Sequence, residues 1–95
     1  MLSTNLDNPR AVPYFLWDEP MTVADVRRLL AEGDDEERFH LIGKIMREAK
    51  DTDVWRFTNP REVRDNWEKI VGNLGRRRAF WEFMFEAWNR NGWID

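Results

Sequence analysis

Apolar residues recur every three or four positions over most of the chain, which predicts helices. The first predicted helix follows Thr22, a residue type that often caps helix N-termini, and it ends at Gly33, because glycine favours helix termination. The second helix begins after Asp34 and carries an apolar stripe made of Phe39, Ile42, Ile45, Met46 and Ala49. Since so few residues separate the two helices, we expect a helical hairpin.

The second half of the chain predicts a short helical turn over residues 51–57 and then two longer helices. Asn59 followed by a proline is a strong start signal, and the apolar stripe behind it predicts a third helix that continues to Gly75. The last predicted helix, residues 76–90, is apolar nearly all round. A helix of that kind lies at the centre of a bundle or contributes an interface as well as a core face.

The N-terminal region has no helical pattern. Residues 1–10 show no periodicity and predict a flexible tail. Residues 12–17 are strongly apolar but lie among prolines, which disfavour helix, so we expect an extended arm that packs on the helices and is stapled to them by Trp17. The alternative for this arm is that another protein holds it.

These elements together predict an all-α fold, a small bundle of four main helices with one short extra helical turn and an extended N-terminal arm. The 95 residues suit one domain, so we expect residues 11–95 to form a single helical domain behind the tail. The sequence has no apolar run of membrane-spanning length, and its first residues lack the apolar core of a signal peptide. We therefore expect a cytoplasmic protein with no membrane partner.

Composition removes most kinds of active site. The chain has no cysteine and one histidine, which excludes disulfides, thiolate metal sites and cysteine nucleophiles and leaves no set of histidines. The acids that follow Gly33 lack the alternating spacing of a calcium loop and suit the start of a helix. Gly72 and Gly75 belong to no phosphate-binding motif. We therefore expect no enzymatic activity, no metal and no cofactor.

The sharpest local feature is the run Arg76, Arg77 and Arg78 at the start of the last helix. Three cations there oppose the helix macrodipole, so local helix energetics do not explain them. Residues 1–53 hold 12 acidic and 7 basic residues in a chain of net charge −3, so pairing with acids of that half, such as those around Gly33, is one explanation. An acidic surface on a protein partner and a nucleic-acid backbone are the others.

The aromatic content is the second unusual feature, with six tryptophans, six phenylalanines and one tyrosine. Trp81 and Trp88 are seven positions apart, so they share a helix face that is able to stack on nucleic-acid bases. Aromatic residues and arginine also dominate protein interfaces. We therefore predict a partner-binding site that consists of Arg76, Arg77, Arg78, Trp81, Phe85, Trp88 and Trp93.

Four blocks of the sequence resemble a family of short, uncharacterised bacterial proteins. They are YFLWD at 14–18, IGKIMREA at 42–49, DVWRF at 53–57 and GRRRAFWEF at 75–83, of which the last is the most specific. The resemblance covers residues 13–94 approximately. Members of that family are often encoded beside a nucleotidyltransferase-like protein of the abortive-infection toxin type. The resemblance thus implies an antitoxin-like or accessory protein, and it implies no catalytic residues.

Three functional hypotheses follow from the sequence. The leading hypothesis is a non-enzymatic, antitoxin-like protein that binds another protein, with a nucleotidyltransferase-type toxin as the partner that the resemblance implies. The alternative is a small nucleic-acid-binding module that uses the Arg76–Arg78 run and the Trp81/Trp88 face. The third is a homodimer whose interface is formed by the last helix.

Overall fold

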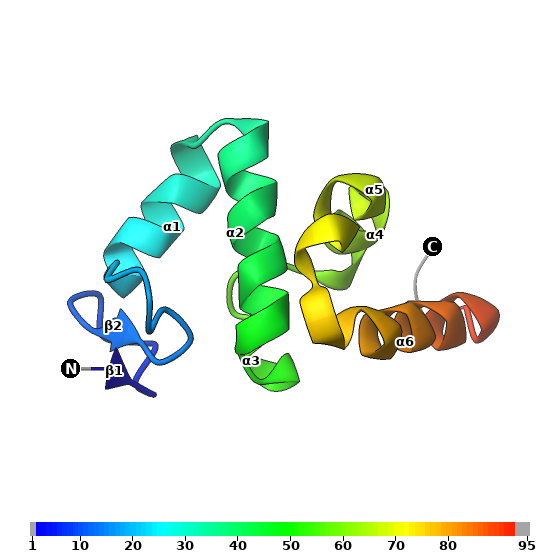
Figure 1. Ribbon diagram of the computed structural model, residues 1–95, viewed down its shortest axis with the longest axis horizontal. Helices are drawn as coiled ribbons and strands as arrows, with labels where there is room; N and C mark the ends of the chain where they lie inside the picture. Colours follow the sequence, from blue (N-terminus) through cyan, green and yellow to red (C-terminus); the bar gives the residue numbers. More distant parts are fainter. Residues whose placement is uncertain (1, 93–95) are drawn as a thin grey trace.

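Helices make up most of the computed structural model, which describes residues 2–92 (Figure 1). In chain order the α-helices are α1 (Val23–Glu32), α2 (Asp35–Glu48), α3 (Asp51–Val54), α4 (Pro60–Asp65), α5 (Trp67–Ile70) and α6 (Arg78–Arg90). The predicted all-α class is therefore confirmed in outline. Within the described range, no helix is both long enough and apolar enough to cross a membrane.

The first two helices form the hairpin that the sequence predicts, and they run side by side in opposite directions (Figure 1). Thr22 and Asp25 form a reciprocal capping box, because each side chain accepts the backbone N–H of the other at 3.1 Å. The side chain of Asp34 caps α2 by accepting the N–H of Glu37 at 2.8 Å. Local sequence signals therefore determine where both helices begin.

The third predicted helix is interrupted, so that prediction is wrong in its detail. The chain forms α4, α5 and a 3-10 turn, η1 (Val71–Asn73), instead of one continuous helix. The break lies at Asn66, whose φ of −120° and ψ of 21° depart from helical values. Its side-chain amide donates to the carbonyl of Glu62 at 2.9 Å, a local bond by which asparagine competes with the helix backbone.

The N-terminal segment contains a small sheet that the pattern of apolar residues does not predict. Strands β1 (Leu2–Ser3) and β2 (Val12–Pro13) pair in parallel, with Leu2 opposite Val12. Residues 2–10, predicted as a flexible tail, fold back along the arm, and the side chain of Leu6 is buried. This segment therefore belongs to the packed structure and adjoins the start of α1, where the N–H of Ala24 donates to the carbonyl of Pro9 at 3.0 Å.

The arm packs on the helices through fewer residues than expected. Phe15 and Leu16 are buried, and the Tyr14 ring lies edge-on to Phe15 with centroids 5.4 Å apart. Trp17, by contrast, has 64% of its surface exposed, so the prediction that it staples the arm to the helices is wrong. The chain forms turns over this segment, so the consecutive residues Phe15 and Leu16 both face the helices while the next side chain, Trp17, faces outward.

Helix α2 is the centre of the molecule. It packs on α1 at one side and on α5, η1 and a second 3-10 turn, η2 (Gly75–Arg77), at the other (Figure 1). All residues from 41 to 46 are buried, including Gly43 and Lys44. A Cβ at Gly43 would lie 2.4 Å from the Cβ of Asn73, so only glycine allows η1 to approach α2 this closely.

Candidate functional site

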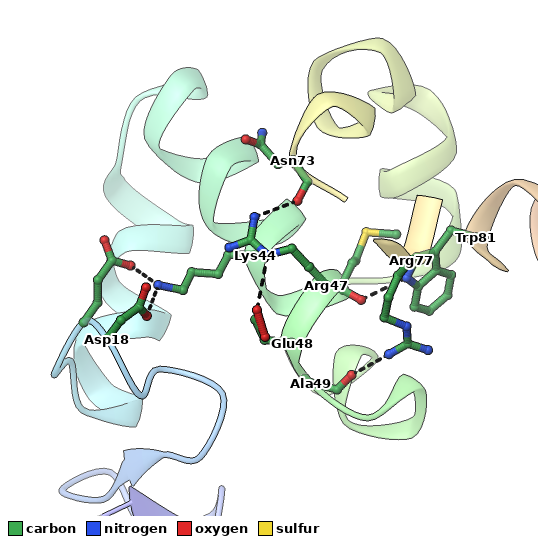
Figure 2. A network of polar contacts seen from close by, with 10 residues as sticks. Asp18, Lys44, Arg47, Glu48, Ala49, Asn73, Arg77 and Trp81 are labelled. Carbon is green, nitrogen blue, oxygen red and sulfur yellow. Dashed lines mark hydrogen bonds and ion pairs between the residues drawn. The ribbon is translucent and has the colours of Figure 1, made fainter. Parts of the chain in front are cut away.

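Two side chains, one in η2 and one in the first turn of α6, satisfy the carbonyl end of α2. The indole N–H of Trp81 donates to the carbonyl of Met46 at 2.9 Å, and the guanidinium of Arg77 donates to that of Ala49 at 2.8 Å (Figure 2). The last carbonyls of a helix have no donor within the helix, so these bonds replace the missing partners. Arg77 also places positive charge at the negative end of the α2 macrodipole, which stabilises it there.

The three arginines of the predicted site have different surroundings. Arg77 is half-buried and lies over the rings of Phe80 and Trp81, 4.7 and 5.5 Å from their centroids. Arg78 makes an exposed ion pair at 3.5 Å with Glu82, one turn further along α6. Arg76 is exposed and forms neither a hydrogen bond nor an ion pair with another residue in the range 2–92.

The explanation that pairs these arginines with acids around Gly33 is therefore wrong for the described part of the chain. The start of α6 lies beside the C-terminal end of α2, whereas those acids lie at its N-terminal end (Figure 1). The unfavourable interaction of the Arg77 charge with the N-terminal end of the α6 dipole is offset by its favourable interaction with the C-terminal end of α2. Arg76 and Arg78 remain without a structural role of that kind.

The aromatic part of the predicted site requires correction. Trp81 has 1% of its surface exposed and Phe85 6%, so both are core residues and neither is accessible to a partner. Trp88 is half-buried against Trp55 and Phe85, with centroids 6.0 and 5.1 Å apart. The predicted Trp81/Trp88 stacking face for nucleic acid is therefore absent from the surface. Trp93 lies outside the described residues.

The exposed aromatic side chains of α6 are ones that the sequence analysis did not select. Phe83 has 63% of its surface exposed and Phe80 37%. They are three positions apart and so are neighbours on the helix surface. Phe83 is also two positions from Trp81, which at about 100° a residue turns it away from the core. We call Ala79, Phe80 and Phe83 the outer face of α6. Arg76 in η2 precedes this face, and Arg78, about 140° from Phe83 around the helix, lies at its border on the side of Glu82.

A basic cleft of about 440 Å³ lies between the end of α2 and η2. Its lining consists of Arg47, Glu48, Gly75, Arg76 and Arg77. Arg47 donates to the carbonyl of Asn73 at 3.1 Å and pairs with Glu48 at 3.4 Å (Figure 2). This cleft is not evident from the sequence, because its cations come from segments almost thirty positions apart and only the fold brings them together.

Lys44 is a second charged group that the sequence analysis missed. Its side chain, 5% exposed, points from the middle of α2 to the arm and donates to Asp18 at 2.5 Å and Glu19 at 2.7 Å (Figure 2). Burial by itself lowers the pKa of Lys44, but the two carboxylates outweigh burial and raise it. The hydrogen bond from Lys44 in turn lowers the pKa of Asp18. These bonds join the arm to the centre of the molecule.

Tyr14 makes a second polar connection between the arm and the helices. Its hydroxyl donates to Asp53 at 2.6 Å and accepts the backbone N–H of Lys50 at 2.8 Å. Burial and the hydrogen bond to Asp53 raise the pKa of Tyr14. Lys50 precedes α3, so this hydroxyl takes the place of a side-chain cap for that short helix.

The other surface hollows carry less specific chemistry. A groove of about 430 Å³ between α5 and α6 is lined by Arg64, Trp67, Glu82, Phe85, Glu86 and Asn89. The only histidine, His40, is exposed beside acidic residues of α2. Across residues 2–92, no group of three or more histidine, aspartate or glutamate side chains is arranged to hold a metal ion.

Comparison with protein-family models, with curated proteins and with solved structures found no match to this chain. Besides the exposed Leu2 and Trp17 of the N-terminal segment, two features remain after the core contacts are assigned. They are the outer face of α6, which exposes two phenylalanines beside Arg76 and Arg78, and the basic cleft that adjoins it.

Proposed function

We propose that this chain is a cytoplasmic, non-enzymatic, antitoxin-like accessory protein that binds another protein through the outer face of α6. The exposure of Phe83, with Phe80 beside it, is the observation that carries the proposal. Full burial of a phenylalanine stabilises by about 1.5–3 kcal/mol, so covering Phe83 favours association strongly. A central aromatic residue with arginine at the edge is the composition typical of interfaces in which few residues dominate binding.

The charged end of this face indicates the chemistry of the partner. Arg76 has no acidic partner among residues 2–92, and the Arg78–Glu82 pair is more than half exposed on the arginine side. Exposed pairs of this kind contribute little, about 0–1 kcal/mol, so Arg78 is free to exchange Glu82 for an acid of a partner. A partner surface that fits this face therefore has an apolar depression for the phenylalanines next to acidic side chains for the arginines.

The family resemblance supplies the proposed identity of the partner, which is a nucleotidyltransferase-type toxin encoded beside this chain. The burial of Trp81 and its bond to Met46 count against the base stacking that the competing nucleic-acid hypothesis needs. The net charge of −3 also provides no general attraction for phosphate backbones. A protein partner is accordingly the better match for an exposed apolar face.

The test uses the proposed partner, a nucleotidyltransferase-type gene product encoded beside this chain, co-expressed with the chain and then titrated against it. Phe83→Ser and Trp17→Ser form a matched pair, because the two side chains are 63% and 64% exposed and lie on α6 and on the arm respectively. We expect Phe83→Ser to weaken binding about 10- to 100-fold, from the lost burial of one aromatic side chain. We expect Trp17→Ser to bind like the native chain.

Two outcomes would contradict the proposal. One is the absence of a complex between the native chain and that gene product. The other is equal weakening by both substitutions. Light scattering on the chain alone covers the homodimer hypothesis, because a dimer that Phe83→Ser dissociates would show that the outer face of α6 binds a second copy instead.

A further inference from the structure

The basic cleft next to η2 has the dimensions and the charge of a ligand site. Its volume of about 440 Å³ lies within the range of small-molecule sites, about 300–1,000 Å³. Three of its five lining residues are arginines and one, Glu48, is acidic, so the lining carries an excess of two positive charges. These cations are drawn from α2 and from the segment that precedes α6, and they converge only in the folded chain.

Two of the guanidinium groups are held in place by backbone carbonyls, and that of Arg47 also pairs with Glu48 at 3.4 Å. Arg47 donates to the carbonyl of Asn73, and Arg77 donates to that of Ala49 (Figure 2). A carbonyl oxygen orients a guanidinium without cancelling its charge, and each guanidinium has five N–H donors, so donors remain for a ligand. Arg77 is fixed further by the rings of Phe80 and Trp81. The cleft is therefore organised before any ligand arrives.

Gly75 allows the backbone of η2 to lie close to the side chain of Arg47 in the cleft. Its φ of +53° lies in the left-handed region, and a Cβ there would come within 3.0 Å of the Cδ of Arg47. A larger residue would displace the stem of Arg47 from its position beside η2. The same glycine therefore allows the turn and the placement of one of the three cations.

We propose that this cleft binds a phosphate group in its dianionic, monoester-like form. A phosphate of that kind carries a charge near −2 and several acceptor oxygens, which match the excess charge and the remaining donors of the lining. A carboxylate or a phosphodiester carries one negative charge and leaves one cation unbalanced. Arginine is also the residue that best matches phosphate geometry through paired N–H donors. This inference does not depend on the proposed protein partner.

The experiment is a titration of the full chain with inorganic phosphate, AMP and adenosine, followed by nuclear magnetic resonance. Arg76→Gln is the test variant, because Arg76 lines the cleft and is exposed without a bond that folding needs. Arg78→Gln is the matched control, since Arg78 carries the same charge, is two residues from Arg76 and does not line the cleft. Glu48→Gln removes the one acid of the cleft while preserving its size.

We expect inorganic phosphate and AMP to bind and adenosine not to bind. Arg76→Gln should weaken phosphate binding about tenfold, the effect of losing a charged hydrogen-bond donor, and Arg78→Gln should change it less than about twofold. Glu48→Gln should tighten binding up to about fivefold. Equal affinity for phosphate and AMP would mean that the cleft recognises the phosphate group alone. Tighter binding of AMP would mean that it also recognises the nucleoside. Both results support a phosphate site.

Three results would overturn the inference. They are phosphate binding weaker than about 10 mM, equal weakening by Arg76→Gln and Arg78→Gln, and tighter binding of a single-stranded oligonucleotide that lacks terminal phosphates. The second result would mean that phosphate senses only general surface charge. All three measurements use the chain alone, so their failure leaves the test with the protein partner unaffected.

Discussion

Replacing Trp81 by phenylalanine tests the connection between α6 and the end of α2. The substitution removes the indole N–H that donates to the carbonyl of Met46, in a side chain that is 99% buried. A buried acceptor left without a donor costs about 1–3 kcal/mol. The smaller ring leaves roughly 40 Å³ unfilled, which adds about 1 kcal/mol. We therefore expect Trp81→Phe to lower the free energy of unfolding by about 2–4 kcal/mol.

Urea denaturation followed by far-UV circular dichroism measures this loss as a lower midpoint with an unchanged slope. Trp88→Phe is the control, because Trp88 is half-buried on the same helix and its indole N–H bonds to no residue within 2–92. We expect a loss of about 1 kcal/mol or less there. A Trp81→Phe protein within about 0.5 kcal/mol of the native chain, or equal to Trp88→Phe, would refute the assignment of Trp81 as a partner for the α2 carbonyls.

Further predictions concern the arm and the packing of α2. Lys44 lowers the pKa of Asp18, so the ionised Asp18 side chain stabilises the fold fully above the ordinary aspartate pKa, and this stabilisation is lost as pH falls. In urea titrations, Asp18→Asn should therefore lose less stability than the native chain between neutral and acidic pH. Tyr14 is the only tyrosine, so the absorbance of its phenolate should appear above the ordinary pKa of 10.0. The hydrogen bonds of the neutral hydroxyl should stabilise the fold fully below that pH, and this stabilisation should disappear as pH rises through the raised pKa. Gly43→Ala should destabilise by about 1–3 kcal/mol, because the new Cβ would lie 2.4 Å from a side-chain carbon of η1. Gly72→Ala, where nothing lies within 4 Å, should change unfolding midpoints little; a loss equal to that of Gly43→Ala would contradict the close-packing explanation.

The starts of α1, α2 and α4 were accessible from the sequence because their determinants are local, whereas α3, α5 and α6 have no side-chain cap. The caps at Thr22, Asp34 and Asn59 each depend on a side chain and an N–H three positions later, and all three bonds form. The break at Asn66 is local as well, but its residue type is compatible with a helix interior and with an end. A pattern of apolar positions does not distinguish the two.

The orientation of α6 was not accessible, because a helix that is apolar nearly all round offers several candidate core faces. Which of Trp81 and Phe83 is buried depends on where α2 lies relative to α6. The burial of Lys44 has the same origin, since its acids belong to an arm with no helical pattern. Both assignments require tertiary contacts that periodicity does not contain.

The central claim is that the outer face of α6 binds a protein partner, and amide hydrogen exchange of the chain with and without that partner tests it most directly. We expect exchange to slow over residues 76–84 and to remain unchanged over residues 14–19 of the arm, because the two segments lie on different sides of α2 (Figure 1). Slower exchange in the arm with no change in α6 would contradict the claim.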